Sequence, residues 1–282
     1  MELFQGFVAT ADLSNDVADI LNSASVPLSS IDSIIWSHHH FDHMGDPSLF
    51  PSSTSLIVGP GFKSNPTTYP GYPKNPDAIT IQDAFEGRQL IELDFSQSQL
   101  KVCGLRAIDW FDDGSFYFLE ALGHTNDHVM ALARTAEEKF ILLGGDAAHH
   151  CGEFRPTPLL PLPESISPSP FESLKSLSSC PCSIFEPIHP LADPKSAFGT
   201  TPFYEPAPPM VEDAVASRAT LEALEALDAC PNVFVIIAHD SSLLDVLEFY
   251  PKAELTGWDG GERNPKEIGR WRFLKDFGKQ VV

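Results

Sequence analysis

The sequence predicts an α/β fold whose sheets are covered by helices. Its 282 residues suffice for one large α/β domain or two small ones with a sizeable core. The first half alternates short β-type runs with turn residues, and several of these runs are almost continuously apolar. Such runs are typical of strands covered on both faces, as in sandwiches whose sheets are flanked by helices. With 43% hydrophobic and 10% aromatic residues, the composition argues against global disorder.

The expected elements of the first half follow in chain order. Residues 16–23 are predicted to be helical because Val17, Ile20 and Leu21 share one face. Strands are predicted at residues 34–37, 55–59, 105–109, 116–121, 129–134 and 140–144, with a short further candidate at residues 4–9.

The middle of the chain is rich in proline. Residues 151–210 hold 14 of the 25 prolines, which fix φ and remove backbone donors. Long regular elements are therefore not expected there, except for a short helix near residues 171–177. A segment of this length is either a functional lid or a linker. Its scattered apolar residues, such as Phe154 and Phe203, favour a partly packed lid inserted in a single domain that spans residues 1–282.

The last third returns to regular structure. Residues 211–229 are predicted to be helical, and the apolar run 232–238 is predicted to be a strand that ends at His239. Ser241 and Ser242 are expected to cap a helix through about residue 247. A last helix is expected to begin at Pro265, since proline is favoured at the first helical position, and to bear Ile268, Trp271 and Leu274.

The charge excludes several classes of partner. The chain has 18 Lys and Arg against 39 Asp and Glu, a formal net charge of −21. Binding nucleic acid or an anionic membrane surface needs a basic face, so neither partner is expected. Residues 1–14 show no signal or transit peptide, and no run approaches the roughly 20 apolar residues of a spanning helix, so a cytoplasmic protein is expected. Five scattered cysteines do not indicate a disulfide framework.

The strongest signal is a histidine cluster that follows the strand predicted at residues 34–37. Four of its side chains are potential metal ligands within six residues, and imidazole with carboxylate suits zinc and related first-row metals. A chance cluster or an adventitious metal site are the alternatives. Three further potential ligands stand at or just after the ends of other predicted strands, where α/β proteins commonly assemble their sites. The seven candidate ligands are His38, His40, Asp42, His43, His124, Asp146 and His239.

These motifs resemble the metallo-β-lactamase superfamily, whose His-x-His-x-Asp-His signature is matched at positions 38–43. The resemblance spans about residues 33–240 and implies an αβ/βα sandwich with two β-sheets flanked by helices. It also implies two Zn²⁺ ions per chain, although other divalent metals are compatible. His38, His40 and His124 would hold one ion, Asp42, His43 and His239 the other, and Asp146 would bridge them. Only 37 residues precede His38, so either the N-terminal sheet is reduced or the chain starts late.

The resemblance is closest to lactonase- and lactamase-like fungal members. It implies a hydrolase that opens a small, neutral, partly apolar cyclic ester or amide by attack of a metal-bound hydroxide. Two metals can share such a hydroxide and polarise the carbonyl, and a zinc site lowers the pKa of water to about 7. Asp42 and Asp146 are the expected catalytic carboxylates. His149 occupies the place where related lactonases carry a tyrosine, so it is expected to stabilise the oxyanion.

Two other functions are compatible with the ligand set. One is a thioesterase of the glyoxalase II or carrier-protein thioesterase type, although an acidic carrier protein would meet like charge here. The other is a non-catalytic metal-binding relative. The C-terminal cations, such as Arg270 and Arg272, are more simply explained as a solvated helix face than as a binding site for an anionic carrier.

The remaining candidates receive modest roles. His39 stands between two ligands and should point away from them if the segment is extended. His128 is expected to contact a ligand from outside, Asp240 to orient a neighbouring ligand, and Cys151 to be a packed thiol. Lid or surface positions are expected for His150 and His189.

Overall fold

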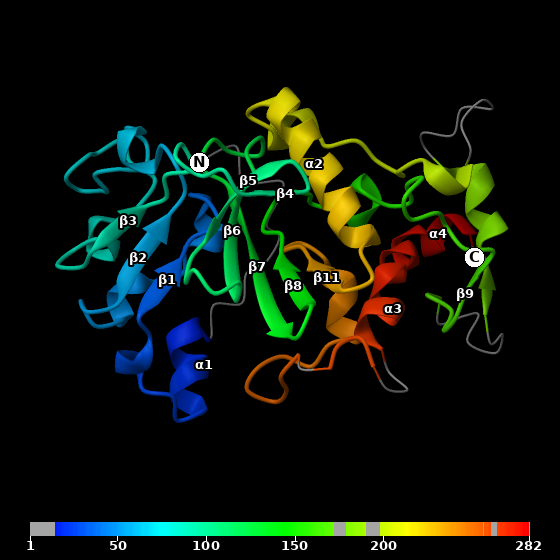
Figure 1. Ribbon diagram of the computed structural model, residues 1–282, viewed down its shortest axis with the longest axis horizontal. Coiled ribbons are helices and arrows are strands. Elements are labelled where there is room, and N and C mark those ends of the chain that lie inside the picture. Colours follow the sequence, from blue (N-terminus) through cyan, green and yellow to red (C-terminus); the bar gives the residue numbers. More distant parts are fainter. Residues whose placement is uncertain (1–14, 172–178, 190–197, 256, 261–263, 282) are drawn as a thin grey trace.

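The computed structural model describes residues 15–171, 179–189, 198–255, 257–260 and 264–281 (Figure 1). The strand candidate at residues 4–9 and most of the helix candidate at 171–177 lie outside this part of the chain. A first sheet contains three parallel strands in the order β1 (Ser33–Ile35), β2 (Ser55–Val58) and β3 (Leu90–Glu92). The first two were expected from the sequence.

A second, six-stranded sheet has the order β11-β8-β7-β6-β5-β4. Strands β4 to β8 pair antiparallel with their sequence neighbours, whereas β11 pairs parallel with β8. As a result, the carboxyl ends of β6, β8 and β11 lie at the same edge. The bounds are β4 (Lys101–Val102), β5 (Leu105–Asp109), β6 (Phe116–Glu120), β7 (Val129–Ala136), β8 (Lys139–Leu143) and β11 (Val233–Ile236).

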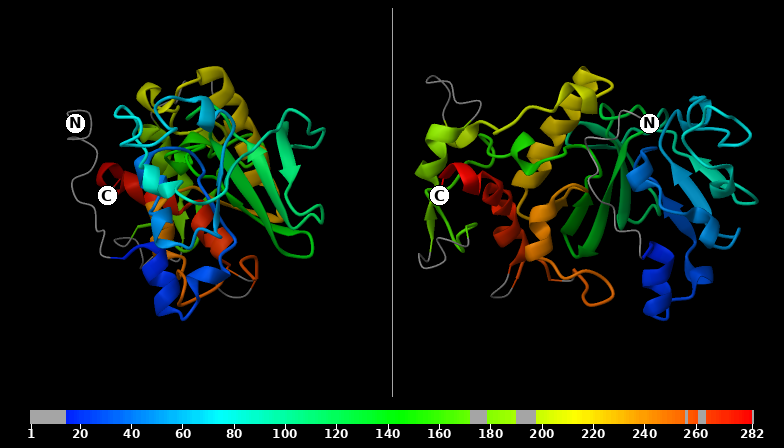
Figure 2. Two further views of the ribbon diagram at one scale, coloured as in Figure 1. Left: turned by 90° about the vertical axis from the view of Figure 1, so that its left-hand side faces the viewer. Right: turned by 180° about the vertical axis from the view of Figure 1, so that it is seen from behind.

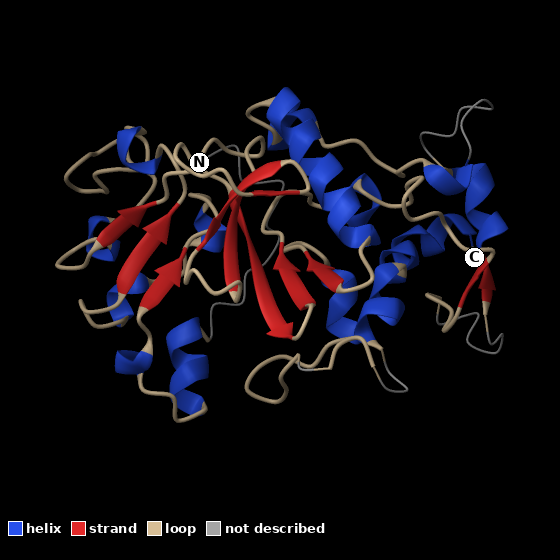
Figure 3. Cartoon of the chain, in the orientation of Figure 1, coloured by secondary structure: helices blue, strands red, loops and turns tan. Residues whose placement is uncertain are grey.

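The core forms layers on both sides of the second sheet. Ile57 of β2 packs with Phe118 of β6 and Val129 of β7, so the two sheets face each other across an apolar layer. The neighbouring Leu119 points to the opposite face, as strand alternation requires, and joins the cluster that contains Leu224 of α2 (Ala214–Ala229). Figures 2 and 3 show α2 and the C-terminal helices beside this sheet.

Helix ends follow from local side-chain contacts. In α1 (Val17–Ser23), Asp16 and Asp19 form a reciprocal capping box. Helix α2 begins after Asp213, whose side chain accepts hydrogen bonds from two backbone N–H groups, and so starts three residues later than predicted. Among the described residues, none of the helices combines the length and the apolar character needed to cross a membrane.

Two predictions for the last third were wrong in detail. The cap near residue 241 is Asp240, whose carboxylate accepts from the Ser242 backbone and hydroxyl. The helix it begins is the short 3₁₀ helix Ser241–Asp245, which does not reach residue 247. The last helix is also interrupted. α3 (Pro265–Arg270) ends at Trp271, and a 3₁₀ helix at Arg272–Phe277 precedes α4 (Gly278–Val281).

The described parts of the proline-rich segment are packed against the rest of the protein. Phe154, Phe185 and Phe203 are 1% exposed or less and belong to the same cluster as Phe273 and Phe277 of the C-terminal 3₁₀ helix. The segment also contains a small antiparallel pair, β9 (Ser165–Ile166) with β10 (Cys180–Pro181). In Figure 1 this pair lies near the C-terminus.

Candidate metal centre

Four loops bring the candidate ligands to one edge of the second sheet. The loop after β1 carries positions 38–43, and His124 follows β6, Asp146 follows β8 and His239 follows β11. Asp146 comes directly after Gly145, which has a φ of +51°. A Cβ at Gly145 would lie 2.8 Å from His128 Nε2, so this turn needs glycine.

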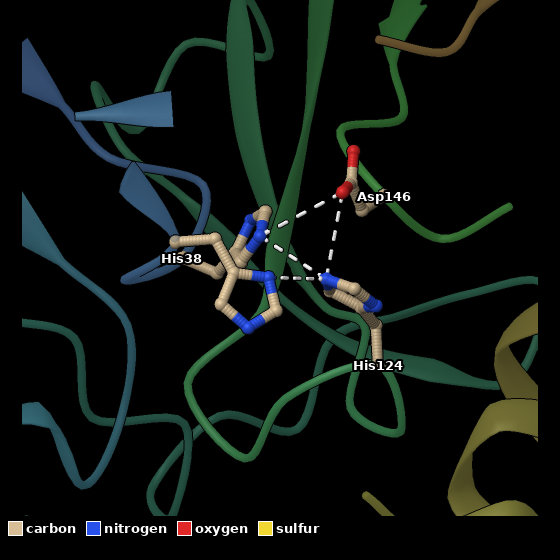
Figure 4. A group of neighbouring side chains, drawn as sticks. His38, His124 and Asp146 are labelled. Atoms are coloured by element: carbon tan, nitrogen blue, oxygen red, sulfur yellow. Dashed lines mark hydrogen bonds and ion pairs between the residues drawn. The ribbon is translucent and has the colours of Figure 1, made fainter. Parts of the chain in front are cut away.

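In one group of donors, His38, His124 and Asp146 are buried and His40 is partly buried. His124 Nε2 lies 3.1 Å from His38 Nε2 and 2.9 Å from His40 Nδ1. Asp146 Oδ2 lies 3.4 Å from His124 Nε2 and 3.8 Å from His38 Nε2. Figure 4 shows His38, His124 and Asp146 pointing toward a common centre. These donor atoms are close enough together to share one ion.

A second group is nearer to solvent. Asp42 Oδ2 lies 3.5 Å from His43 Nε2 and 3.6 Å from His239 Nε2. The side chains of Asp42 and His239 are 39% and 41% exposed. Asp146 stands between the groups, with Oδ1 3.2 Å from His43 Nε2 and Oδ2 3.2 Å from His239 Nε2. The structure thus brings together all seven side chains named from the sequence.

The electrostatics of these donors fit bound cations. Burial lowers the pKa of His38 well below its ordinary value and that of His124 to about 3, so both imidazoles are neutral at pH 7. Burial alone would raise the pKa of Asp146, but its contacts with His149, His239 and His43 outweigh burial and keep it ionised. Neutral imidazole nitrogens that converge on a carboxylate form a donor set suited to divalent first-row metals.

Residues outside the two donor groups make hydrogen bonds that hold the candidate ligands His124 and Asp146 in place. His124 Nδ1 donates to the carbonyl of Met210, 2.7 Å away at the end of the proline-rich segment. His128 is fully buried, and it donates through Nδ1 to Ala121 and accepts the backbone N–H of Asp146 through Nε2. The expectation that His128 contacts a ligand from outside is confirmed. Because burial lowers its pKa to about 4, His128 remains neutral and able to accept.

His149 lies at the boundary of the two groups. Its Nε2 is 3.3 Å from Asp146 Oδ2, and its ring stacks on His239 with centroids 5.4 Å apart. Glu153, which the sequence analysis missed, is buried and accepts the His149 backbone N–H. His149, Asp146 and His239 form a further group with converging donor atoms.

The other singled-out residues lie outside these groups. His39 points away from the ligands and contacts Asp127 at 2.7 Å. The prediction for Asp240 was wrong, because its carboxylate caps the following 3₁₀ helix and accepts from the Cys151 thiol instead of contacting a ligand histidine. Cys151 is a buried thiol, as expected. His150 Nδ1 accepts the Gly152 backbone N–H and caps the 3₁₀ helix Cys151–Glu153, and the His189 ring stacks on Phe203.

A cavity of about 310 Å³ adjoins the His39–Asp127 pair. Prolines and Phe62 form apolar parts of its wall, and Asn126 adds a polar side chain. Its full lining is His39, Pro60, Gly61, Phe62, Ser64, Asn65, Pro66, Asn126 and Asp127. Because His39 lies between His38 and His40 in the sequence, the cavity borders the loop that carries these two candidate ligands.

The chain is similar to known proteins in sequence and in fold. No family model matches the chain. It is 44% identical over 271 residues to gamma-lactamase FDB1 of Fusarium pseudograminearum, covering 94% of this chain but 63% of that protein. It is 48% identical over 198 residues to gamma-lactamase MBL2 of Gibberella moniliformis, covering 69% of this chain and 79% of that protein.

A solved structure supports the fold. The structure of a mutant of B. thuringiensis AiiA with N-decanoyl-L-homoserine at its active site matches with a TM-score of 0.50 and 14% identity, over 88% of this chain and 74% of that one. The chain belongs to the metallo-β-lactamase superfamily, and the expected fold is confirmed. Within that superfamily its relatives include the two fungal gamma-lactamases, and it spans under two thirds of the length of one of them.

Proposed function

We propose that this protein is a zinc-dependent hydrolase that opens a small cyclic ester or amide. The observation that carries the proposal is the position of Asp146, which lies within 3.8 Å of histidine nitrogens from both donor groups. Two relatives with more than 40% identity are named gamma-lactamases, which supports a cyclic amide as the substrate.

The residues would hold two ions. His38, His40 and His124 are the proposed ligands of the first ion, and Asp42, His43 and His239 those of the second, with Asp146 shared. Imidazole nitrogens and carboxylate oxygens are ligands that zinc commonly takes in proteins, and divalent ions of this kind lower the pKa of water and polarise a carbonyl when bound. Each group supplies at least three converging donor atoms, so the chain has enough donors for two ions.

The chain's own residues would direct substrate and protons. His124 and Asp146 of the first group are buried, whereas Asp42 and His239 are about 40% exposed, so the substrate would approach from the side of the second group. Asp146 stays ionised and would take up a proton and pass it to the leaving nitrogen or oxygen. His149, 18% exposed and 3.3 Å from Asp146, would donate an Nε2–H hydrogen bond to the oxyanion.

The proline-rich segment would border the substrate. Its beginning contacts His149 through Glu153, and its end contacts His124 through the Met210 carbonyl. We therefore propose that residues 151–210 form a packed lid-like insertion of a single domain, not a linker between two domains.

The test is a hydrolysis assay on a panel of γ-lactams, γ-lactones and thioesters, with protein stripped of metal by a chelator as a control. Ring opening that returns with added zinc supports the proposal. Asp146→Ala should abolish turnover, and His149→Phe should lower kcat by about 10²–10³-fold, the cost of losing one oxyanion donor. His150→Gln, outside both donor groups, is the matched control and should retain full activity.

The other outcomes discriminate between the alternatives. Activity confined to thioesters would identify a thioesterase. A folded protein that binds two ions but opens no ring on the panel would contradict the substrate class. A folded protein that retains no metal would favour a non-catalytic relative.

A further inference from the structure

The carboxylate of Asp127 connects two of the loops that carry candidate ligands. A single oxygen, Oδ1, accepts hydrogen bonds from His39 Nδ1 at 2.7 Å and from the Thr125 hydroxyl at 2.7 Å. Asp127 is 5% exposed and His39 is 6% exposed, so neither bond competes with bulk water. Hydrogen bonds to an ionised acceptor are stronger than neutral ones, and burial strengthens them further.

Both donors stand next to proposed ligands of the first ion. His39 is flanked by His38 and His40, and Thr125 directly follows His124. Each of these three ligands is therefore one residue away from a side chain held by the same oxygen. The exposed ligands of the second ion, Asp42 and His239, come from other parts of their loops and do not contact Asp127 in the described structure.

Two contacts hold the main chain around Asp127 in place. Gly59, at the end of β2, passes so close that a Cβ there would lie 1.7 Å from the Asp127 carbonyl oxygen. The Asn126 backbone N–H donates to Glu212 at 2.9 Å, which ties the same turn to the segment before α2. The carboxylate therefore has little freedom to follow a displaced His39 or Thr125.

We propose that Asp127 is a positioning residue that sets the separation of His38 and His40 from His124, and so controls affinity for the first ion more than for the second. This inference rests on the ligand assignment of the proposed function. Outer contacts of this kind change metal affinity by about 10–100-fold when they are removed. The effect should pass through the hydrogen bonds of Asp127, because its carboxylate does not belong to either donor group.

The test is a zinc titration of the whole protein against a competing chromophoric chelator, which resolves a tighter and a weaker ion. Four variants are compared with the parent protein: Asp127→Ala, His39→Phe, the double variant, and Ser55→Ala as a control. Ser55→Ala removes a partly buried hydrogen bond of similar length, between Ser33 and Ser55 at 2.7 Å, that joins β1 and β2 without touching the ligand loops. The absorption spectrum of the cobalt-loaded protein provides a second readout of ligand geometry.

A reference variant, His239→Ala, lacks a proposed ligand of the second ion and identifies that ion in the titration. We expect Asp127→Ala to weaken the first ion by about 10–100-fold and the second by less than about threefold. The zinc affinities of the double variant should lie within about twofold of those of Asp127→Ala, because both changes break the same contact. Ser55→Ala should leave both affinities and the cobalt spectrum unchanged.

Three results would overturn the inference: equal weakening of both ions in Asp127→Ala, no change in either ion, or additive losses in the double variant. Parent protein that binds fewer than two ions would instead contradict the proposed function. Thermal unfolding of the metal-free variants separates an effect on the ligands from a general loss of stability. Asp127→Ala should reduce affinity for one ion even when the metal-free protein remains folded at the assay temperature.

Discussion

The ion pair between Arg155 and Asp228 should be one of the most important contacts for the stability of this fold. The Arg155 guanidinium donates through Nε and through a terminal nitrogen to the two Asp228 oxygens, at 2.7 and 2.6 Å. Its other terminal nitrogen donates to the Arg270 carbonyl at 2.7 Å. Both charged side chains are 3% exposed. The pair joins the proline-rich segment to α2 and to the end of α3.

The magnitude follows from what each substitution leaves behind. Replacing Asp228 by leucine leaves a buried guanidinium without its counter-ion, and replacing Arg155 by methionine leaves a buried carboxylate. Breaking a buried pair from one side costs about 3–5 kcal/mol. In a domain of this size that free energy corresponds to a fall in Tm of roughly 10 °C. The double variant, with no buried charge left over, should recover most of the loss, except for about 1 kcal/mol from the unpaired Arg270 carbonyl.

Urea unfolding followed by circular dichroism would measure these differences, with each variant compared at the same pH and in excess chelator. Neither Arg155 nor Asp228 belongs to a donor group, so zinc affinity should remain within about twofold of the parent protein. The reasoning would be refuted by single variants that lose less than about 1 kcal/mol, or by a double variant as unstable as either single one.

Three further outcomes follow from the structure. Chelation should lower Tm, since ions that bind only the folded state stabilise it by mass action, and differential scanning calorimetry with and without zinc measures the shift. Metal-free protein should lose stability as pH falls from about 6.5 to 4, because burial lowers the pKa of His128 from 6.5 to about 4. The contribution of His128, about 3 kcal/mol, is present in full above pH 6.5 and is lost as the pH falls towards 4. Burial also lowers the pKa of His38 and His124, whose contributions are lost over the same range, so His128→Gln should reduce the slope of this part of an acid titration, and an unchanged slope would contradict the prediction. Gly59→Ala should prevent folding or displace Asp127, which proteolysis and zinc titration detect. Gly260→Ala is the control, because its φ is not positive and the nearest atom to its Cβ would lie 3.9 Å away.

The sequence predicted the parts of this protein that depend on short-range pattern. Strands such as β5 and β6 were visible because their apolar residues are covered on both faces. The seven candidate ligands were visible because imidazoles and carboxylates cluster at strand ends, and parallel strands bring those ends to one edge. No long-range information was needed for either inference.

Features that depend on distant contacts could not be predicted in this way. The Asp240 carboxylate accepts from the Cys151 thiol, 89 residues away in the chain. The role of Asp127 depends on His39, 88 residues away in the chain. The contact between Met210 and His124 likewise joins residues 86 positions apart. Such pairings are consequences of the fold and leave no periodic signal in the sequence.

The attachment of the proline-rich segment at both ends has an evolutionary consequence. Glu153 anchors its start beside His149, and the Met210 carbonyl anchors its end on His124. Exposed positions between these anchors, such as Leu159 at 61% exposure, can change without displacing a donor atom, whereas the buried Arg155 and Phe203 hold the segment to the rest of the fold. Changes at such exposed positions can therefore alter the surface beside the candidate metal centre while the seven candidate ligands are inherited unchanged.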